Sequence, residues 1–203
     1  MTSAKERAMD AELIAKVKQF VKEECLNETS KYGSDVYYFH FLPAAEYAQT
    51  LALQLHADEE VVVLAALLHD IGAIMYGREH HHVTGAQIAE QKLKEFGYAA
   101  EKIEKVKKCI LHHRGSIPSP SESVEEQIIK DVDGMDAFDR LPGLFRAAYV
   151  YEGLSEAEAR TSVRKKLANC YEKLSLSARI LVEDKFRAVM LLLRAREVEH
   201  GKH

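Results

Sequence analysis

Apolar residues recur at helical spacing along almost the whole chain, and this pattern restricts the fold more than any other feature. In the first such stretch, Leu13, Val17, Phe20 and Val21 stand at positions i, i+4, i+7 and i+8, which lie on one face of an α-helix. No run of alternating apolar and polar residues is long enough to indicate a strand. The sequence therefore predicts an all-α helical bundle.

Capping and breaking residues set the expected helix bounds. Asp58 and Ser123 are placed to cap two helices, and Glu126 completes a capping-box pattern with Ser123. Gly72 is placed to end a helix in a left-handed turn. No linker or repeat divides the chain, so one domain spanning residues 1–203 is expected. The expected helices span residues 10–26, 36–56, 57–72, 83–96, 99–113, 124–139, 144–151, 155–174 and 176–199.

Composition excludes several classes of function. The formal net charge is −4 and there is no basic tract, so we expect no nucleic acid polymer as the main partner. No stretch reaches the roughly 20 apolar residues of a membrane-spanning helix, and the first twenty residues lack the apolar core of a secretory signal. The three cysteines are far apart, which predicts neither a disulfide framework nor a cysteine zinc site. A cytoplasmic protein without membrane contact is expected.

The apolar run VVVLAALL ends in an imidazole beside a carboxylate, His69 and Asp70. A charged aspartate next to so apolar a segment needs a counter-charge or a bound cation. Asp131 and Asp133 interrupt a later apolar pattern, and His40 stands within the aromatic stretch YYFHF. Alone, each has an ordinary structural interpretation, such as a solvated helix face. Together they offer imidazole and carboxylate ligands, which suit divalent transition metals.

The order of these residues resembles the HD-domain superfamily of metal-dependent phosphohydrolases. The segment LAALLHDIGA is similar to the central signature of that family, and DVDGMDA is similar to its late helix. The resemblance covers roughly residues 36–149 and implies that His40, His69, Asp70 and Asp133 bind a metal ion. It also implies a helical metal-binding core over the same residues.

Two further histidine clusters extend the resemblance. The segment HHHVTGAQIAEQKL is similar to a family helix with a His-x-x-x-Gly-Ala pattern, which favours His81 as a ligand and leaves its neighbour His82 as the alternative. The segment KCILHHRGS resembles a helix-end His-His pair of members with two metals, where His112 is preferred over His113. The expected cofactor is therefore one or two divalent ions of Mn, Fe, Ni, Zn or Mg, and these histidines favour two.

The resemblance implies hydrolysis of a small phosphorylated metabolite or nucleotide by a metal-activated water. Asp70 is the expected catalytic residue, because its carboxylate would bridge two ions and accept a proton from the water. Arg114, Lys130 and Arg78 are the expected phosphate-binding cations, each with a solvated surface cation as its ordinary interpretation. Asp131 is expected to support the ligands without binding the metal. Ala73 replaces a lysine found in many relatives, and no Gly-Tyr-Pro follows the second histidine pair, which disfavours cyclic dinucleotides.

Two alternatives stay open at this level. Some proteins of the same fold hold two irons with four histidines and two aspartates and use oxygen to cleave C–C or C–P bonds. A non-catalytic helical module with a decayed site is the other. Residues 155–200 are expected to form packing helices, which contact either the core of the same chain or a second copy in a homodimer.

Overall fold

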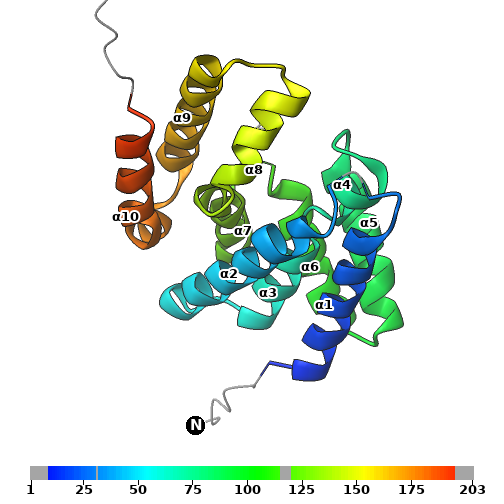
Figure 1. Ribbon diagram of the computed structural model, residues 1–203. Helices are drawn as coiled ribbons and strands as arrows, with labels where there is room; N and C mark the ends of the chain where they lie inside the picture. The colour runs from blue at the N-terminus through cyan, green and yellow to red at the C-terminus, as the bar shows by residue number, and fades with distance from the viewer. Residues whose placement is uncertain (1–8, 31, 115–119, 195–203) are drawn as a thin grey trace, which may run out of the picture.

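The computed structural model describes residues 9–30, 32–114 and 120–194, and these residues form helices and turns without a strand (Figure 1). The all-α prediction is confirmed. In chain order the elements are α1 (Ala11–Leu26), η1 (Tyr37–Phe41), α2 (Leu42–Leu55), α3 (Glu59–Leu68), α4 (Ile71–Tyr76), α5 (His81–Glu95), α6 (Ala100–His112), α7 (Val124–Met135), η2 (Asp136–Phe138), α8 (Leu141–Arg146), η3 (Ala147–Tyr151), α9 (Glu156–Lys173) and α10 (Leu176–Leu192).

Helix α3 is the centre of the core. Every residue from Val61 to Leu68 is buried, and the helix contacts α1, α2, α6 and α7. A helix that is apolar all round requires neighbours on every side, because no face of it is suited to water. His69 and Asp70 follow this helix directly, so His69 lies buried inside the bundle and Asp70 is only partly exposed.

The predicted caps are present, since the side chain of Asp58 accepts from the Val61 N–H at 3.2 Å and that of Ser123 accepts from the Glu126 N–H at 3.2 Å. Gly97, expected to end a helix, has a left-handed φ of 79°. Several predicted helices are interrupted or shorter. The stretch 36–56 begins with the five-residue π-helical turn η1, and 124–139 ends at α7 with the 3-10 turn η2 after it.

The prediction for Gly72 is wrong. Helix α3 ends at Leu68, Asp70 turns the chain with φ −105° and ψ 10°, and α4 starts at Ile71, so Gly72 lies within α4. A side chain on Gly72 would place its Cβ 2.4 Å from the His81 carbonyl oxygen and 2.6 Å from the Gly85 nitrogen. Glycine is needed here because the backbones of α4 and α5 touch, not because the chain must turn.

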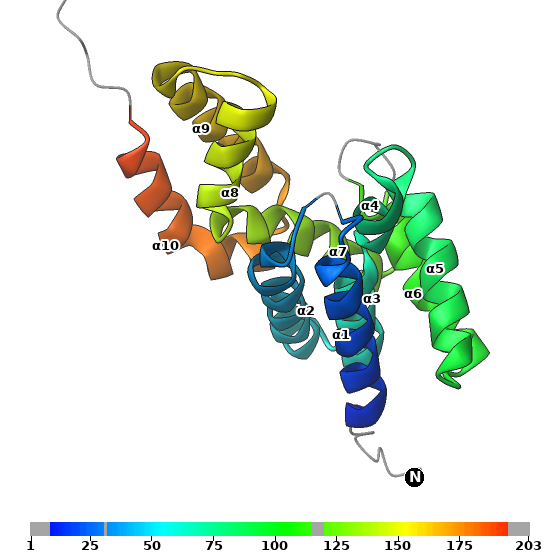
Figure 2. The same ribbon diagram turned by 45° about the vertical axis from the view of Figure 1, so that its right-hand side comes forward.

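Helices α9 and α10 form one end of the molecule (Figure 2). They pack on each other, on α7 and on η2, and the rings of Tyr171 and Phe186 stack with centroids 3.9 Å apart between them. Within the expected range of packing helices, 155–200, α9 and α10 end at Lys173 and Leu192, and residues 195–200 lie outside the described residues. The single-domain boundaries and the choice between core and homodimer contact stay predictions.

Within the described ranges, no single helix has the length and apolar character of a membrane span. The bent pair Glu59–Tyr76 and His81–Glu95, with 114° between its two parts, passes that test by length and composition only.

Candidate metal centre

Four buried imidazoles meet at the end of the central helix. His40 comes from the π-helical turn η1, His69 follows α3, His81 opens α5 and His113 follows α6. Each lies at a helix end or in an irregular helical turn, where the local backbone directs the side chain inward. π-helical turns are rare and occur frequently at functional sites. Four elements distant in sequence thus contribute one ring each to the same place.

The carboxylate of Asp70 is the common point of contact. Its Oδ1 lies 3.1 Å from Nε2 of His81 and 3.5 Å from Nε2 of His113, and its Oδ2 lies 3.4 Å from Nε2 of His40. His69 completes the cluster. The ligand atoms form two groups that share Asp70, the first with His40 and His69 and the second with His81 and His113, each compact enough to hold one ion. The Asp70 side chain is 20% exposed, so the centre opens to solvent there.

Three of the imidazoles are held by an identical local contact. Their Nδ1 atoms lie 2.8, 2.8 and 2.6 Å from the backbone carbonyl oxygens of Ala66, Arg78 and Ile110, each three residues before the histidine. A carbonyl oxygen only accepts, so Nδ1 carries the proton and donates it. The lone pair therefore sits on Nε2, the atom that faces Asp70, which is the tautomer that metal ligation requires.

His40 is held differently. Its Nδ1 hydrogen-bonds to the carboxylate of Asp136, which is fully buried and 96 residues away in sequence. Arg140 forms an ion pair with the same carboxylate, with Nη2 3.0 Å from Oδ1 and Nε 2.9 Å from Oδ2. The sequence analysis missed Asp136 and Arg140. The signal was their i, i+4 spacing, which places an arginine one turn after an aspartate.

The surroundings shift the pKa values of His40 and His69 in opposite directions. Burial alone would lower the pKa of His40, but the Asp136 carboxylate outweighs it and raises the pKa to about 9. Burial lowers the pKa of His69 to about 4. The pKa of the Asp70 carboxyl is held well below its usual range despite burial, because the imidazoles of His113, His40 and His81 lie beside its oxygens and stabilise the charge. Asp70 is therefore a carboxylate, and His69 is a neutral ligand at physiological pH.

A metal ion fits this cluster. Nε2 of His40 and Nε2 of His69 are buried and have no hydrogen-bond partner. Nε2 of His81 and Nε2 of His113 face each other at 3.2 Å, so two lone pairs would meet unless a proton or a cation lies between them. A buried polar atom without a partner costs about 1–3 kcal/mol, and a cation beside Asp70 would remove that cost for all four rings.

The structure brings His40, His69, Asp70 and His81 together, as expected. Asp133 lies at the edge, with Oδ1 3.9 Å from Nε2 of His69 and a side chain 37% exposed.

His112 is the exception among the predicted ligands, because the structure brings His113 to Asp70 instead. The Nδ1 of His112 is paired with Oε2 of Glu126 at 2.9 Å. Successive helical residues point about 100° apart, so only one member of the pair can face Asp70. The carbonyl of Ile110 selects His113. Glu126 thereby faces His112 rather than completing the predicted capping box.

The predicted phosphate-binding cations surround the cluster without a described contact to Asp70. Arg78 is exposed, although its carbonyl holds His81. Arg114 is partly buried and close to His82, whose pKa is lowered by burial, by His81 and by the arginine charge. Lys130 is partly buried on α7. Their phosphate-binding role stays a prediction.

Asp131 supports the fold rather than the four imidazoles. Its Oδ1 accepts from the Ser175 backbone N–H at 2.8 Å and from Gln127 Nε2 at 3.3 Å, which ties α7 to the start of α10.

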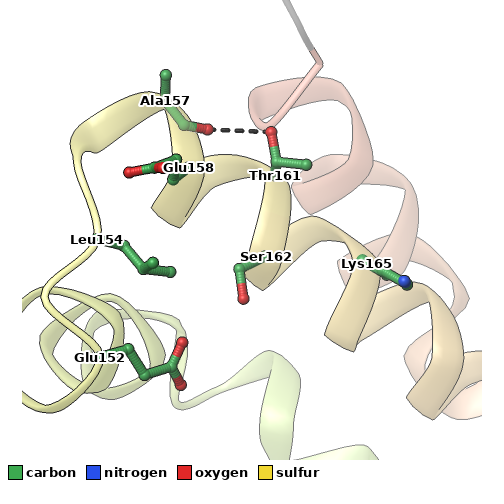
Figure 3. Close-up of a pocket in the computed structure, with 7 residues that line it drawn as sticks. All are labelled: Glu152, Leu154, Ala157, Glu158, Thr161, Ser162 and Lys165. Carbon is green, nitrogen blue, oxygen red and sulfur yellow. Dashed lines mark hydrogen bonds between the residues drawn. The ribbon is translucent and has the colours of Figure 1, made fainter.

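A surface groove lies away from the histidine cluster. A groove of about 640 Å³ runs between the end of η3 and the first turns of α9 and is lined by Glu152, Leu154, Ala157, Glu158, Thr161, Ser162 and Lys165 (Figure 3). None of these residues belongs to the histidine cluster. Glu158 is engaged in the capping box of Ser155, so the groove presents no converging set of polar groups.

Comparisons with known proteins agree with this arrangement. A family model described as the HD domain matches residues 37–138, about half of the chain. This range contains His40, Asp70, His113 and Asp136 but ends before Arg140.

Two solved structures are similar at 20% identity, which shows the fold. Bacillus subtilis YpgQ, solved in complex with ADP, has a TM-score of 0.65 and covers 89% of this chain and 94% of its own. An HD-superfamily hydrolase from Bacillus thuringiensis has a TM-score of 0.66 and covers 90% and 93%.

Similarity also extends to part of larger proteins. A tRNA (cytidine(56)-2'-O)-methyltransferase from Thermoplasma volcanium is 31% identical over 159 residues, which is 71% of this chain and 46% of that protein. The chain spans about half the length of the curated relatives it matches.

Proposed function

The chain belongs to the HD-domain family, and from that premise we propose that it is a metal-dependent phosphohydrolase acting on a small phosphorylated metabolite or nucleotide. One observation carries the proposal. Four imidazoles gather around one aspartate in two groups of ligand atoms, and each has its Nδ1 fixed by an acceptor. Such second contacts are characteristic of metal-binding histidines, because they set the tautomer and the ring orientation.

His40, His69, Asp70 and Asp133 would hold one ion, and Asp70, His81 and His113 the other. His113 thus replaces His112 in the predicted ligand set. When bound, divalent ions in such a site lower the pKa of water and offset the charge of a phosphate. The identity of the metal and the number of ions belong to the proposal.

The side chains of the site have separate tasks in this scheme. Asp70 offers a partly exposed carboxylate to the four-imidazole cluster and is the proposed proton acceptor for the attacking water. The four rings are buried, and His69, whose pKa burial lowers to about 4, is neutral without a metal ion. Asp133, the most exposed of the proposed ligands, lies where the substrate enters.

A nucleotide is one of the two substrate classes proposed, and the ADP complex of the similar YpgQ protein supports it. Arg78, Arg114 and Lys130 are the proposed phosphate contacts from the sequence. Methyl transfer is not proposed, because the chain spans less than half of the methyltransferases that it resembles.

The test is phosphate release by protein loaded separately with Mn, Fe, Ni, Zn or Mg, with a panel of nucleotides and sugar phosphates. Release that depends on metal and is lost in Asp70→Asn supports the proposal. Asp184→Asn on α10, an exposed residue, is the matched control and keeps wild-type activity. Activity that requires oxygen, with a mixed-valence iron signal, would support the oxygenase alternative instead; no observation on the described residues favours it.

A further inference from the structure

Arg140 stands at the junction of η2 and α8 and belongs to a relay that reaches the metal centre. Its guanidinium contacts both oxygens of Asp136 at 3.0 and 2.9 Å, and Asp136 in turn holds Nδ1 of His40. His40 faces Asp70 with Nε2 at 3.4 Å. The contacts therefore run from Arg140 through Asp136 and His40 to Asp70.

The relay has a physical reason. A fully buried carboxylate is costly unless it is paired and hydrogen-bonded, and a guanidinium satisfies a carboxylate with two parallel N–H bonds. Asp136 has no access to water, so Arg140 and His40 are its partners. Without Arg140, the buried Asp136 carboxylate would keep only His40 as a partner and would hold the ring less firmly in place.

Arg140 differs from Asp136 in one respect that matters for function. Its side chain is 30% exposed, whereas Asp136 is fully buried. A guanidinium has five N–H donors. Nη2 donates one to Asp136, and the buried Nε, although 2.9 Å from Oδ2, has no hydrogen-bond partner, so three N–H groups remain on Nη1 and Nη2. The charge of Arg140 also interacts with Asp133 and Asp70, the two partly exposed carboxylates at the opening of the centre.

Two of the predicted phosphate-binding cations also lie near the centre. The charge of exposed Arg78 acts on Tyr32, on which Asp70 acts too, and that of Arg114 acts on His82, on which His81 and His113 act too. Arg140 is fixed by its contact with Asp136, so it would lose little side-chain entropy on binding a ligand.

Resting on the proposed phosphohydrolase function, we propose that Arg140 has two roles. It is a positioning residue for His40, acting through Asp136. It is also a phosphate-binding residue, whose outer N–H groups contact the non-bridging oxygens of a phosphate held at the metal centre.

The test uses binding of inorganic phosphate to the Mn-loaded protein, measured by calorimetry, so that it does not depend on turnover. At saturating Mn, Arg140→Gln is expected to weaken phosphate binding by about tenfold or more, as for a lost charged hydrogen bond. Arg140→Lys keeps the charge but not the fork and is expected to lie between wild type and Arg140→Gln. Arg146→Gln, an exposed arginine on the same helix α8, is the control and should bind as wild type.

A second pair of measurements separates the two roles. Asp136→Asn removes the charge behind His40 and leaves Arg140, so Mn affinity should fall about 10–100-fold while phosphate affinity at saturating Mn stays within about threefold. Wild-type phosphate affinity in Arg140→Gln at saturating Mn would overturn the phosphate-binding role. Unchanged Mn affinity in Arg140→Gln would overturn the positioning role.

Folding and function are controlled separately. If Arg140→Gln does not fold, as judged by circular dichroism, the comparison of Arg140→Lys with wild type decides, and equal phosphate affinity would refute the proposal. Failure of the proposed function looks different: phosphate would bind through Arg140 although no substrate of the panel is hydrolysed.

Discussion

The two halves of the metal centre are built by different means. In the second group, His81 and His113 are each fixed by a carbonyl three residues earlier. In the first group, His69 is fixed in the same way, but His40 is fixed by Asp136, a side chain 96 residues away that itself depends on Arg140. Local backbone geometry thus sets all of the second group, while the first group also depends on long-range tertiary packing. We expect the halves to respond differently to mutation and to pH.

The largest effect is expected at the residue that the halves share. Asp70→Ala removes a carboxylate within 3.5 Å of three imidazole nitrogens, so both groups lose their common ligand. Turnover should fall by roughly 10³-fold or more, as when a metal-assisted nucleophile is lost, while the helical circular dichroism spectrum is retained. Substantial residual turnover in this variant would show that Asp70 is not the catalytic centre.

Gly72→Ala is expected to damage the second half and spare the first. The added Cβ would meet the His81 carbonyl oxygen at 2.4 Å, and backbone cannot yield as a flexible side chain would. The cost in unfolding free energy should be about 1–3 kcal/mol, with His81 displaced and one ion lost per chain by elemental analysis. Gly143→Ala, where nothing lies within 4 Å, is the matched control. Loss of both ions in Gly72→Ala would mean that the halves are not separable.

Two adjacent histidines provide a sharper comparison. His113→Ala should weaken metal binding by the second group about 10–100-fold, the scale of a disturbed ligand environment. His112→Ala should leave metal binding unchanged, because that ring pairs with Glu126. Competition with a fluorescent chelator measures both affinities. The reverse order of effects would restore the assignment made from the sequence.

The smallest expected effect, at most about tenfold for each pH unit, concerns pH. The pKa of His40 is raised to about 9 in the folded chain, above its ordinary value of 6.5. Its protonated form therefore stabilises the metal-free fold fully below pH 6.5, and this stabilisation is lost as pH rises through about 9. Binding of an ion at Nε2 must displace that proton, so affinity of the first group should rise by up to tenfold per unit between these limits. Calorimetry in buffers of different ionisation enthalpy should detect one released proton at pH 7.5, and no release would contradict this account.

The sequence predicted the parts of the centre that depend on short patterns. Helical periodicity and the His69-Asp70 pair after an apolar run located the core, and the family resemblance added His40, His81 and Asp133. It could not separate His112 from His113, of which the structure brings His113 to Asp70, because the direction of a helix-end side chain depends on the last turn. Asp136 and Arg140 were missed because their partner, His40, is distant in the chain.

Gly72 shows the same limit in another form. A glycine after a helix suggests a left-handed turn, whereas this one permits close contact with α5, which lies outside its sequence neighbourhood. The caps at Asp58 and Ser123 were predicted correctly, because each side chain bonds to a backbone N–H only three residues later.

The most direct test of the central claim is an anomalous-scattering map of crystals of the Mn-loaded protein. We predict two peaks on either side of the Asp70 carboxylate, about 3.5–4 Å apart, one beside His40 and His69 and one beside His81 and His113. Absence of any peak within ligand distance of Asp70, with the metal bound elsewhere on the chain, would contradict the account.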